Sequence, residues 1–178
     1  IQAADLWAIR DDVSRRIATT VSSAAEAAEW VRIQDGRDVG TFSSWELCVM
    51  AKRSFLAYER DANATARRLY SEALASTPAL AQARLGIGWT HLEDYCFGWS
   101  DDPAASLSQA EAAASAAVVT TRTEASSLYL NSYVHLLRKN FDRAEDLSAR
   151  ARSANANDPE ILLHHGYVVS CKGAPVHG

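Results

Sequence analysis

The stretch NATARRLYSEALASTP, residues 63–78, carries Ala66, Tyr70 and Ala73 on one face of a helix and ends with Pro78. Small residues at this spacing let a second helix approach closely, and the aromatic ring fills the space beside them. The same spacing returns in two later sets: Ala110, Ala114 and Ala117, and then Ala144, Ser148 and Ala151. The interval from the first set to the second is longer, by ten positions, than the interval from the second to the third.

Another series of small residues has the same register. Its members are Ser54, Gly88, Ser132 and Gly166, and the middle one of their three intervals is longer than the other two by the same ten positions. The period is therefore about 34 residues, which is typical of tetratricopeptide repeats made of two amphipathic helices. One ten-residue insertion interrupts it, and CFGWSDDPAA (residues 96–105) is the candidate. A generic alanine-rich bundle is the alternative, but it gives no reason for two series to share one insertion.

We therefore predict an all-α fold, a right-handed superhelix of about three tetratricopeptide hairpins with no β-sheet. A helical N-terminal segment and loop (residues 1–43) precedes the hairpins, and a C-terminal helix caps them. Ser43 with Glu46 forms a capping-box pattern before the first hairpin, and Asp158 before Pro159 marks the start of the last helix. The predicted repeats are 44–80, 81–124, 125–158 and, in part, 159–178.

Composition and charge argue against several classes of function. The net charge of −4 without a basic stripe argues against nucleic-acid binding, and no apolar run approaches the ~20 residues that span a bilayer. Three cysteines, Cys48, Cys96 and Cys171, lie far apart. We expect free thiols, no structural metal, no cofactor and a cytoplasmic location. The chain opens at Ile1 without a Met, and we expect it to be cut from a longer protein.

Signs of catalysis are weak. Asp101 and Asp102 precede Pro103, where carboxylates cap a helix. His164 and His165 are adjacent, so on a helix they point about 100° apart and do not readily share one metal ion. No Ser, Cys or Lys stands in a motif that activates a nucleophile. We therefore predict a protein that is not an enzyme.

One aromatic set shares the repeat register. Each member follows the small residue of its helix by one position: Phe55, Trp89, Tyr133 and Tyr167. In a tetratricopeptide superhelix the first helices of the hairpins line the concave surface, so these rings predict a partner-binding ladder there. Tyr129 extends it, and Lys52, Gln82 and Glu93 are expected at its polar margins. The alternative is that the rings only pack against neighbouring repeats.

Tetratricopeptide domains that bind the C-terminal carboxylate of chaperones use Lys, Arg and Asn in this groove. The corresponding places here hold other residues, namely Ala51, Phe55, Gly86, Ser126 and Leu130. We expect a bound peptide to be held by apolar and aromatic contact instead.

Three stretches resemble known regulatory tails: DLWAIRDDVSRRIATTV (5–21), ARLGIGWTHLEDYCFGWSDDP (83–103) and NANDPEILLHHGYVVSCKG (155–173). They are similar to the tetratricopeptide tails of bacterial class III adenylate/guanylate cyclases and of winged-helix transcriptional regulators. Ala156 departs from the proline usual in those tails. The resemblance implies a non-catalytic signalling module that binds a protein or peptide. A homodimerisation module is the alternative function, and a small stand-alone enzyme is a third.

Overall fold

The computed structural model describes residues 24–31, 42–117 and 123–173, and all regular structure in these ranges is α-helical. The prediction of an all-α fold is confirmed for them. A short helix covers residues 24–31. The other helices are α2 (Ser44–Phe55), α3 (Arg60–Ser76), α4 (Ala81–Cys96), α5 (Pro103–Ala116), α6 (Glu124–Leu137), α7 (Phe141–Ala154) and α8 (Pro159–Gly173).

Helix starts follow the capping patterns of the sequence. Ser43 and Glu46 form the predicted capping box in front of α2. Asp102 accepts a hydrogen bond of 3.0 Å from the Ala105 amide at the start of α5. Asp158 likewise accepts from two backbone amides in the first turn of α8. These side chains satisfy N–H groups that have no partner inside the helix.

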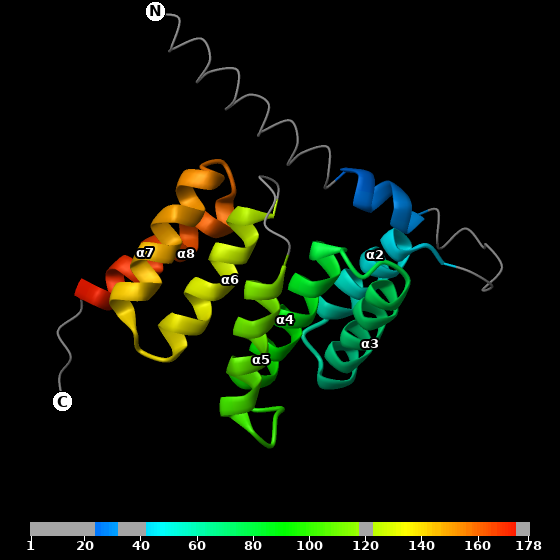
Figure 1. The fold of residues 1–178 in the computed structure, drawn as a ribbon, viewed down its shortest axis with the longest axis horizontal. Coiled ribbons are helices and arrows are strands. Elements are labelled where there is room, and N and C mark those ends of the chain that lie inside the picture. The colour runs from blue at the N-terminus through cyan, green and yellow to red at the C-terminus, as the bar shows by residue number, and fades with distance from the viewer. Residues whose placement is uncertain (1–23, 32–41, 118–122, 174–178) are drawn as a thin grey trace, which may run out of the picture.

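The helices lie in chain order, from α2 and α3 at one end to α7 and α8 at the other (Figure 1). Each helix packs against the next, and α4 also contacts both α2 and α6. In the second series of small residues, Gly88 and Ser132 are buried, Ser54 is half-buried and Gly166 is exposed. The first series is buried throughout: Ala66, Ala73, Ala110, Ala114, Ala117, Ala144, Ser148 and Ala151. Burial of this set agrees with the predicted repeat register.

Two glycines show how closely the helices approach. A Cβ at Gly86 would lie 2.4 Å from the ring of Tyr70 on α3. A Cβ at Gly88 would lie 2.6 Å from Leu130 on α6 and 3.1 Å from Ala113 on α5. Neighbouring helices therefore fill the space that the two glycines leave.

A polar network joins the first hairpin to the second. Asn63, which is 1% exposed, donates to the Thr90 carbonyl at 2.9 Å and to the Asp94 carboxylate at 2.8 Å. Arg67 donates to the Thr90 hydroxyl at 2.9 Å and forms an ion pair of 2.5 Å with Asp94. Since its members come from both α3 and α4, this network fixes how the two helices cross.

The short helix at residues 24–31 contacts α2 through Glu26, which pairs with Lys52, and through Trp30, which lies 5.6 Å from the Arg53 guanidinium. The other residues of the predicted N-terminal segment and loop, 1–23 and 32–41, lie outside the described residues. Within the described ranges, no helix combines the length and apolar character needed to cross a bilayer.

Candidate functional site

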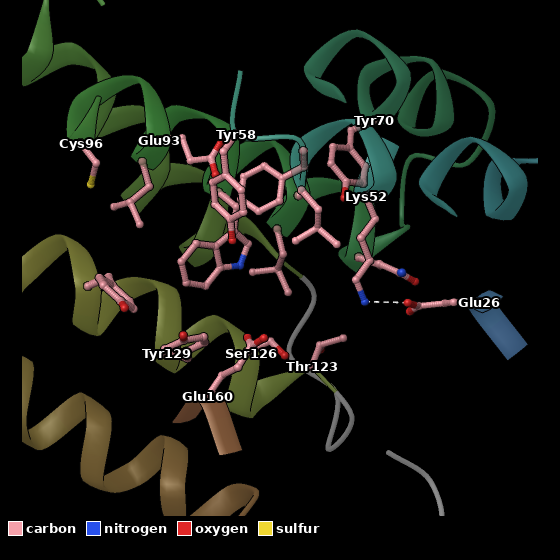
Figure 2. A pocket seen from close by; sticks show the side chains of 18 of the residues that line it. Glu26, Lys52, Tyr58, Tyr70, Glu93, Cys96, Thr123, Ser126, Tyr129 and Glu160 are labelled. Carbon is pink, nitrogen blue, oxygen red and sulfur yellow. Dashed lines mark hydrogen bonds and ion pairs between the residues drawn. The ribbon is translucent and has the colours of Figure 1, made fainter. Parts of the chain in front are cut away.

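A cavity of about 760 Å³ lies beside the first helices of the hairpins, and residues of α2, α4, α6 and the start of α8 line it. In Figure 2, Glu93 and Tyr58 lie on one side of this cavity, and Tyr129 and Glu160 lie on the other. Seven of the eight predicted site residues line it: Lys52, Phe55, Gln82, Trp89, Glu93, Tyr129 and Tyr133. The eighth, Tyr167, lines an adjoining cavity of about 290 Å³ together with Tyr129 and Tyr133.

The rings of α4 and α6 form one aromatic cluster. The Trp89 centroid lies 4.9 Å from Tyr129 and 5.6 Å from Tyr133. Tyr133 stacks on His164 of α8 at 3.9 Å. Trp89, Tyr129 and Tyr133 are all half-buried. The same rings thus pack between hairpins and present part of their surface to the cavity. Each ring therefore contributes both to the packing of the helices and to the wall of the cavity.

Helix geometry places these rings. Trp89 and Tyr133 each follow a buried small residue, Gly88 and Ser132, by one position. One position turns a side chain about 100° round the helix axis. A side chain one position after a residue that is buried between the two helices of a hairpin therefore points away from that contact and toward the cavity.

The two rings at the ends of the predicted ladder are not part of the aromatic cluster. Phe55 is half-buried and Tyr167 is 58% exposed. Neither makes a ring-to-ring contact with any residue that the structure describes. The observed arrangement is a central cluster with two outlying rings, in place of an evenly spaced ladder.

The three polar site residues differ in their surroundings. Lys52 is exposed and its ammonium lies 2.6 Å from the carboxylate of Glu26 (Figure 2). Gln82 is half-buried. Glu93 was expected at the margin, but it is only 7% exposed. It follows Trp89 by one helical turn, so it shares the face of α4 that points into the cavity.

Burial raises the pKa of several titratable groups of the cavity, so the phenols and the thiol among them stay protonated at neutral pH. It raises the pKa of Tyr129, with Tyr133 adding to the effect, and it raises the pKa of Tyr133. Burial and then the charge of Glu93 raise the pKa of the Cys96 thiol. Burial, followed by the neighbouring Asp94, raises the pKa of Glu93 to about 7. Phenols and thiols in this state suit non-covalent contact and hydrogen-bond donation.

The sequence did not point to three large aromatic residues that also line the cavity. They are Trp45 at the start of α2, Tyr58 in the α2–α3 connection and Phe97 after the end of α4. Tyr58 and Phe97 contact each other with centroids 6.4 Å apart. None has an aromatic residue at the equivalent position of another repeat, so the repeat register gave no signal for them.

The paired histidines face different neighbours. His164 Nε2 lies 2.8 Å from the Ser132 hydroxyl, and His165 Nδ1 lies 2.8 Å from the Ser148 hydroxyl. Among the described residues, no three His, Cys, Asp or Glu side chains gather in a way that could hold a metal ion. Cys48, Cys96 and Cys171 are free thiols.

Comparisons with protein-family models, with curated proteins and with solved structures found no match to this chain.

Proposed function

We propose that the chain is a tetratricopeptide-type module, a right-handed superhelix that binds a segment of a partner protein in the cavity beside its first helices. One observation carries the proposal: residues chosen from the repeat register on α2, α4 and α6 converge on a single cavity of about 760 Å³. Partly exposed aromatic rings are favoured as binding anchors because they bury large area at little cost in entropy.

The repeat assignment is supported by contacts within the chain. Successive helices form three pairs, and the first helices of neighbouring pairs touch. With the resemblance of three stretches to cyclase and winged-helix regulator tails, this supports a regulatory role inside a bacterial signalling protein. Either parent type fits these resemblances, and the module itself is proposed to bind and not to catalyse.

Selection of random peptides displayed on phage tests the proposal without knowledge of the native partner. Peptides that enter the cavity should lose at least tenfold in affinity for Trp89→Ala and for Tyr58→Ala, which is the usual effect of a binding anchor. Tyr58 is 59% exposed, so its removal should leave the melting temperature nearly unchanged. Trp89→Ala should also lower the melting temperature because Trp89 packs on Tyr129.

Leu162→Ala is the matched control, because Leu162 is 44% exposed and lines neither cavity. Its affinity for the selected peptides should equal that of the wild type. If the peptides bind the two cavity variants as tightly as the wild type, the cavity is not the binding site.

Self-association is a second candidate, and the outer face of α8 favours it. Four large apolar side chains of that helix are exposed by 43% to 77%: Leu162, Leu163, Tyr167 and Val169. Light scattering over a range of protein concentrations tests this, with Leu163→Glu as the variant that should prevent association. A mass that stays monomeric at every concentration would argue against it.

A further inference from the structure

Two adjacent carboxylates of α4 have opposite surroundings. Asp94 accepts hydrogen bonds from Arg67 and Asn63, so its charge is satisfied. Glu93 lines the cavity and is 93% buried, since its exposed fraction is 7%. Its Oε2 atom has no hydrogen-bond partner. The guanidinium of Arg67 is already engaged by Asp94 and Thr90.

A charged carboxylate that is buried without a counter-ion destabilises the folded chain. Burial without a counter-ion disfavours the charged form, and the side chain either takes up a proton or needs a cation. The pKa of Glu93, raised to about 7 by burial and by Asp94, shows that the folded chain holds this group near the balance of the two forms at neutral pH. A cation brought into the cavity would shift that balance to the carboxylate.

The cavity itself holds no spare cation among the described residues. Its Lys52 is paired with Glu26 at 2.6 Å. The other charged groups that line it, Asp158 and Glu160, are acidic. The remaining titratable groups, from the α2–α3 connection and from α3, α4 and α6, are phenols and one thiol: Tyr58, Tyr70, Cys96, Tyr129 and Tyr133.

Aromatic faces complete the surroundings. Trp89 precedes Glu93 by one turn of α4, and Tyr58 lines the same cavity as Glu93 (Figure 2). Ring faces attract cations, most strongly for tryptophan, and the attraction grows when water is excluded. The same rings are apolar enough to hold the methylene stem of a long cationic side chain.

We propose that the cavity receives a lysine or arginine side chain of the bound partner, with Glu93 as its counter-ion and the rings of Trp89 and Tyr58 as its walls. This inference rests on the proposed function and names the chemistry of the partner. An acidic side chain would face Glu93, Asp158 and Glu160 and would be repelled.

Blocked pentapeptides Ac-Ala-Ala-X-Ala-Ala-NH₂ test the inference, with X as lysine, arginine, norleucine or glutamate. Norleucine matches the lysine stem but lacks the ammonium. Binding is followed by NMR through the shift of the Trp89 indole N–H. The lysine and arginine peptides should bind at least tenfold more tightly than the norleucine peptide, and the glutamate peptide should bind most weakly.

The variant Glu93→Gln keeps the shape and removes the charge. It should lower the affinity for the lysine peptide about tenfold and leave that for the norleucine peptide unchanged. Glu72→Gln is the matched control, because Glu72 lies on the exposed face of α3, paired with Arg68. That variant should bind the lysine peptide as the wild type does.

A proton readout separates a counter-ion from a merely structural residue. Binding of the lysine peptide should release protons at pH 7, and its affinity should rise between pH 6 and pH 8, because the cation favours the ionised carboxylate. Calorimetry in two buffers of different ionisation enthalpy measures the release. Both effects should be absent in Glu93→Gln.

The outcomes are distinct. Equal shifts of Trp89 by the lysine and norleucine peptides would overturn the cation assignment and leave the cavity as a peptide site. Selected phage peptides that depend on Trp89 and Tyr58 but lack a basic residue would do the same. If no peptide of either kind perturbs Trp89, this inference falls together with the proposed function.

Discussion

Helices α6 and α8 hold corresponding positions of the predicted repeat, yet their environments differ. Val134 and Val168 correspond to each other, and both are 0% exposed. Tyr133 is half-buried in the aromatic cluster, whereas its equivalent Tyr167 is 58% exposed. The register therefore determines which side of a helix faces the preceding helices. Burial of the other side depends on a helix that follows, as expected for an array in which each unit contacts only its neighbours.

The largest expected difference between the two helices concerns leucine side chains. Leu130 of α6 is 0% exposed and Leu163 of α8 is 77% exposed. Leu130→Ala should lower the free energy of unfolding by ~3–5 kcal/mol because it leaves a cavity between hairpins. Leu163→Ala should change it by less than ~0.5 kcal/mol. Urea denaturation measures both, and similar losses would mean that the outer side of α8 is covered in solution.

A buried histidine on the inner side of α8 should make the free energy of unfolding depend on pH. His164 is 2% exposed, and burial, followed by the charge of His165, lowers its pKa from 6.5 to about 4. Below pH 6.5 His164 binds a proton in the unfolded chain, whereas in the folded chain it stays neutral down to about pH 4. Stability from this group is therefore complete above pH 6.5 and is lost as the pH falls toward 4, by on the order of 2–3 kcal/mol.

Thermal unfolding at pH 7.5, 6.0 and 5.0 checks this expectation. His164→Gln should be less stable than the wild type at pH 7.5, because the stacking on Tyr133 is lost, but its stability should fall less with acid. A residual slope is expected from His91, whose pKa burial and then Arg67 lower to about 4. An unchanged slope in His164→Gln would show that the histidine is not buried in its neutral form.

The smallest expected effects come from the two equivalent glycines, and they have opposite signs. Gly88→Ala should cost ~1–2 kcal/mol, because the added methyl group would overlap Leu130 and Ala113, which belong to two different helices. Gly166 has no atom within 4 Å of an added Cβ. Gly166→Ala should raise stability by ~0.5–1 kcal/mol through helix propensity alone. A loss in Gly166→Ala would indicate that a partner covers α8.

The sequence predicted the parts of the molecule that depend on local chemistry and on the period. The capping residues Ser43, Asp102 and Asp158 depend only on their own turn, and the buried alanines follow from helix spacing. The partial burial of Trp89 and Tyr133 follows from their positions, because each comes one position after a buried small residue. The register that placed them also placed Phe55, a third ring of the cavity lining.

Other features of the site depend on contacts between segments that the period does not relate. Tyr58 and Phe97 meet across two different connections, with their centroids 6.4 Å apart. Glu93 was expected at the polar margin of the site, but it is only 7% exposed. The spacing of apolar residues on one helix predicts that a charged residue lies at the edge of the apolar face. Whether that residue is buried depends on how several helices pack together, which the spacing does not describe.

The burial of one thiol has a consequence for the motions of the array. Cys48 is 0% exposed in the core of the first hairpin, and burial, with a smaller contribution from Glu26, raises its pKa to about 12. A thiol-specific reagent reacts with the thiolate, so Cys48 can be modified only while that hairpin is open. Cys96 is exposed and Cys171 is half-buried. The modification rate of Cys48 would therefore report how often the first hairpin opens, and the exposed Cys96 would give the reference rate of a thiol that needs no opening.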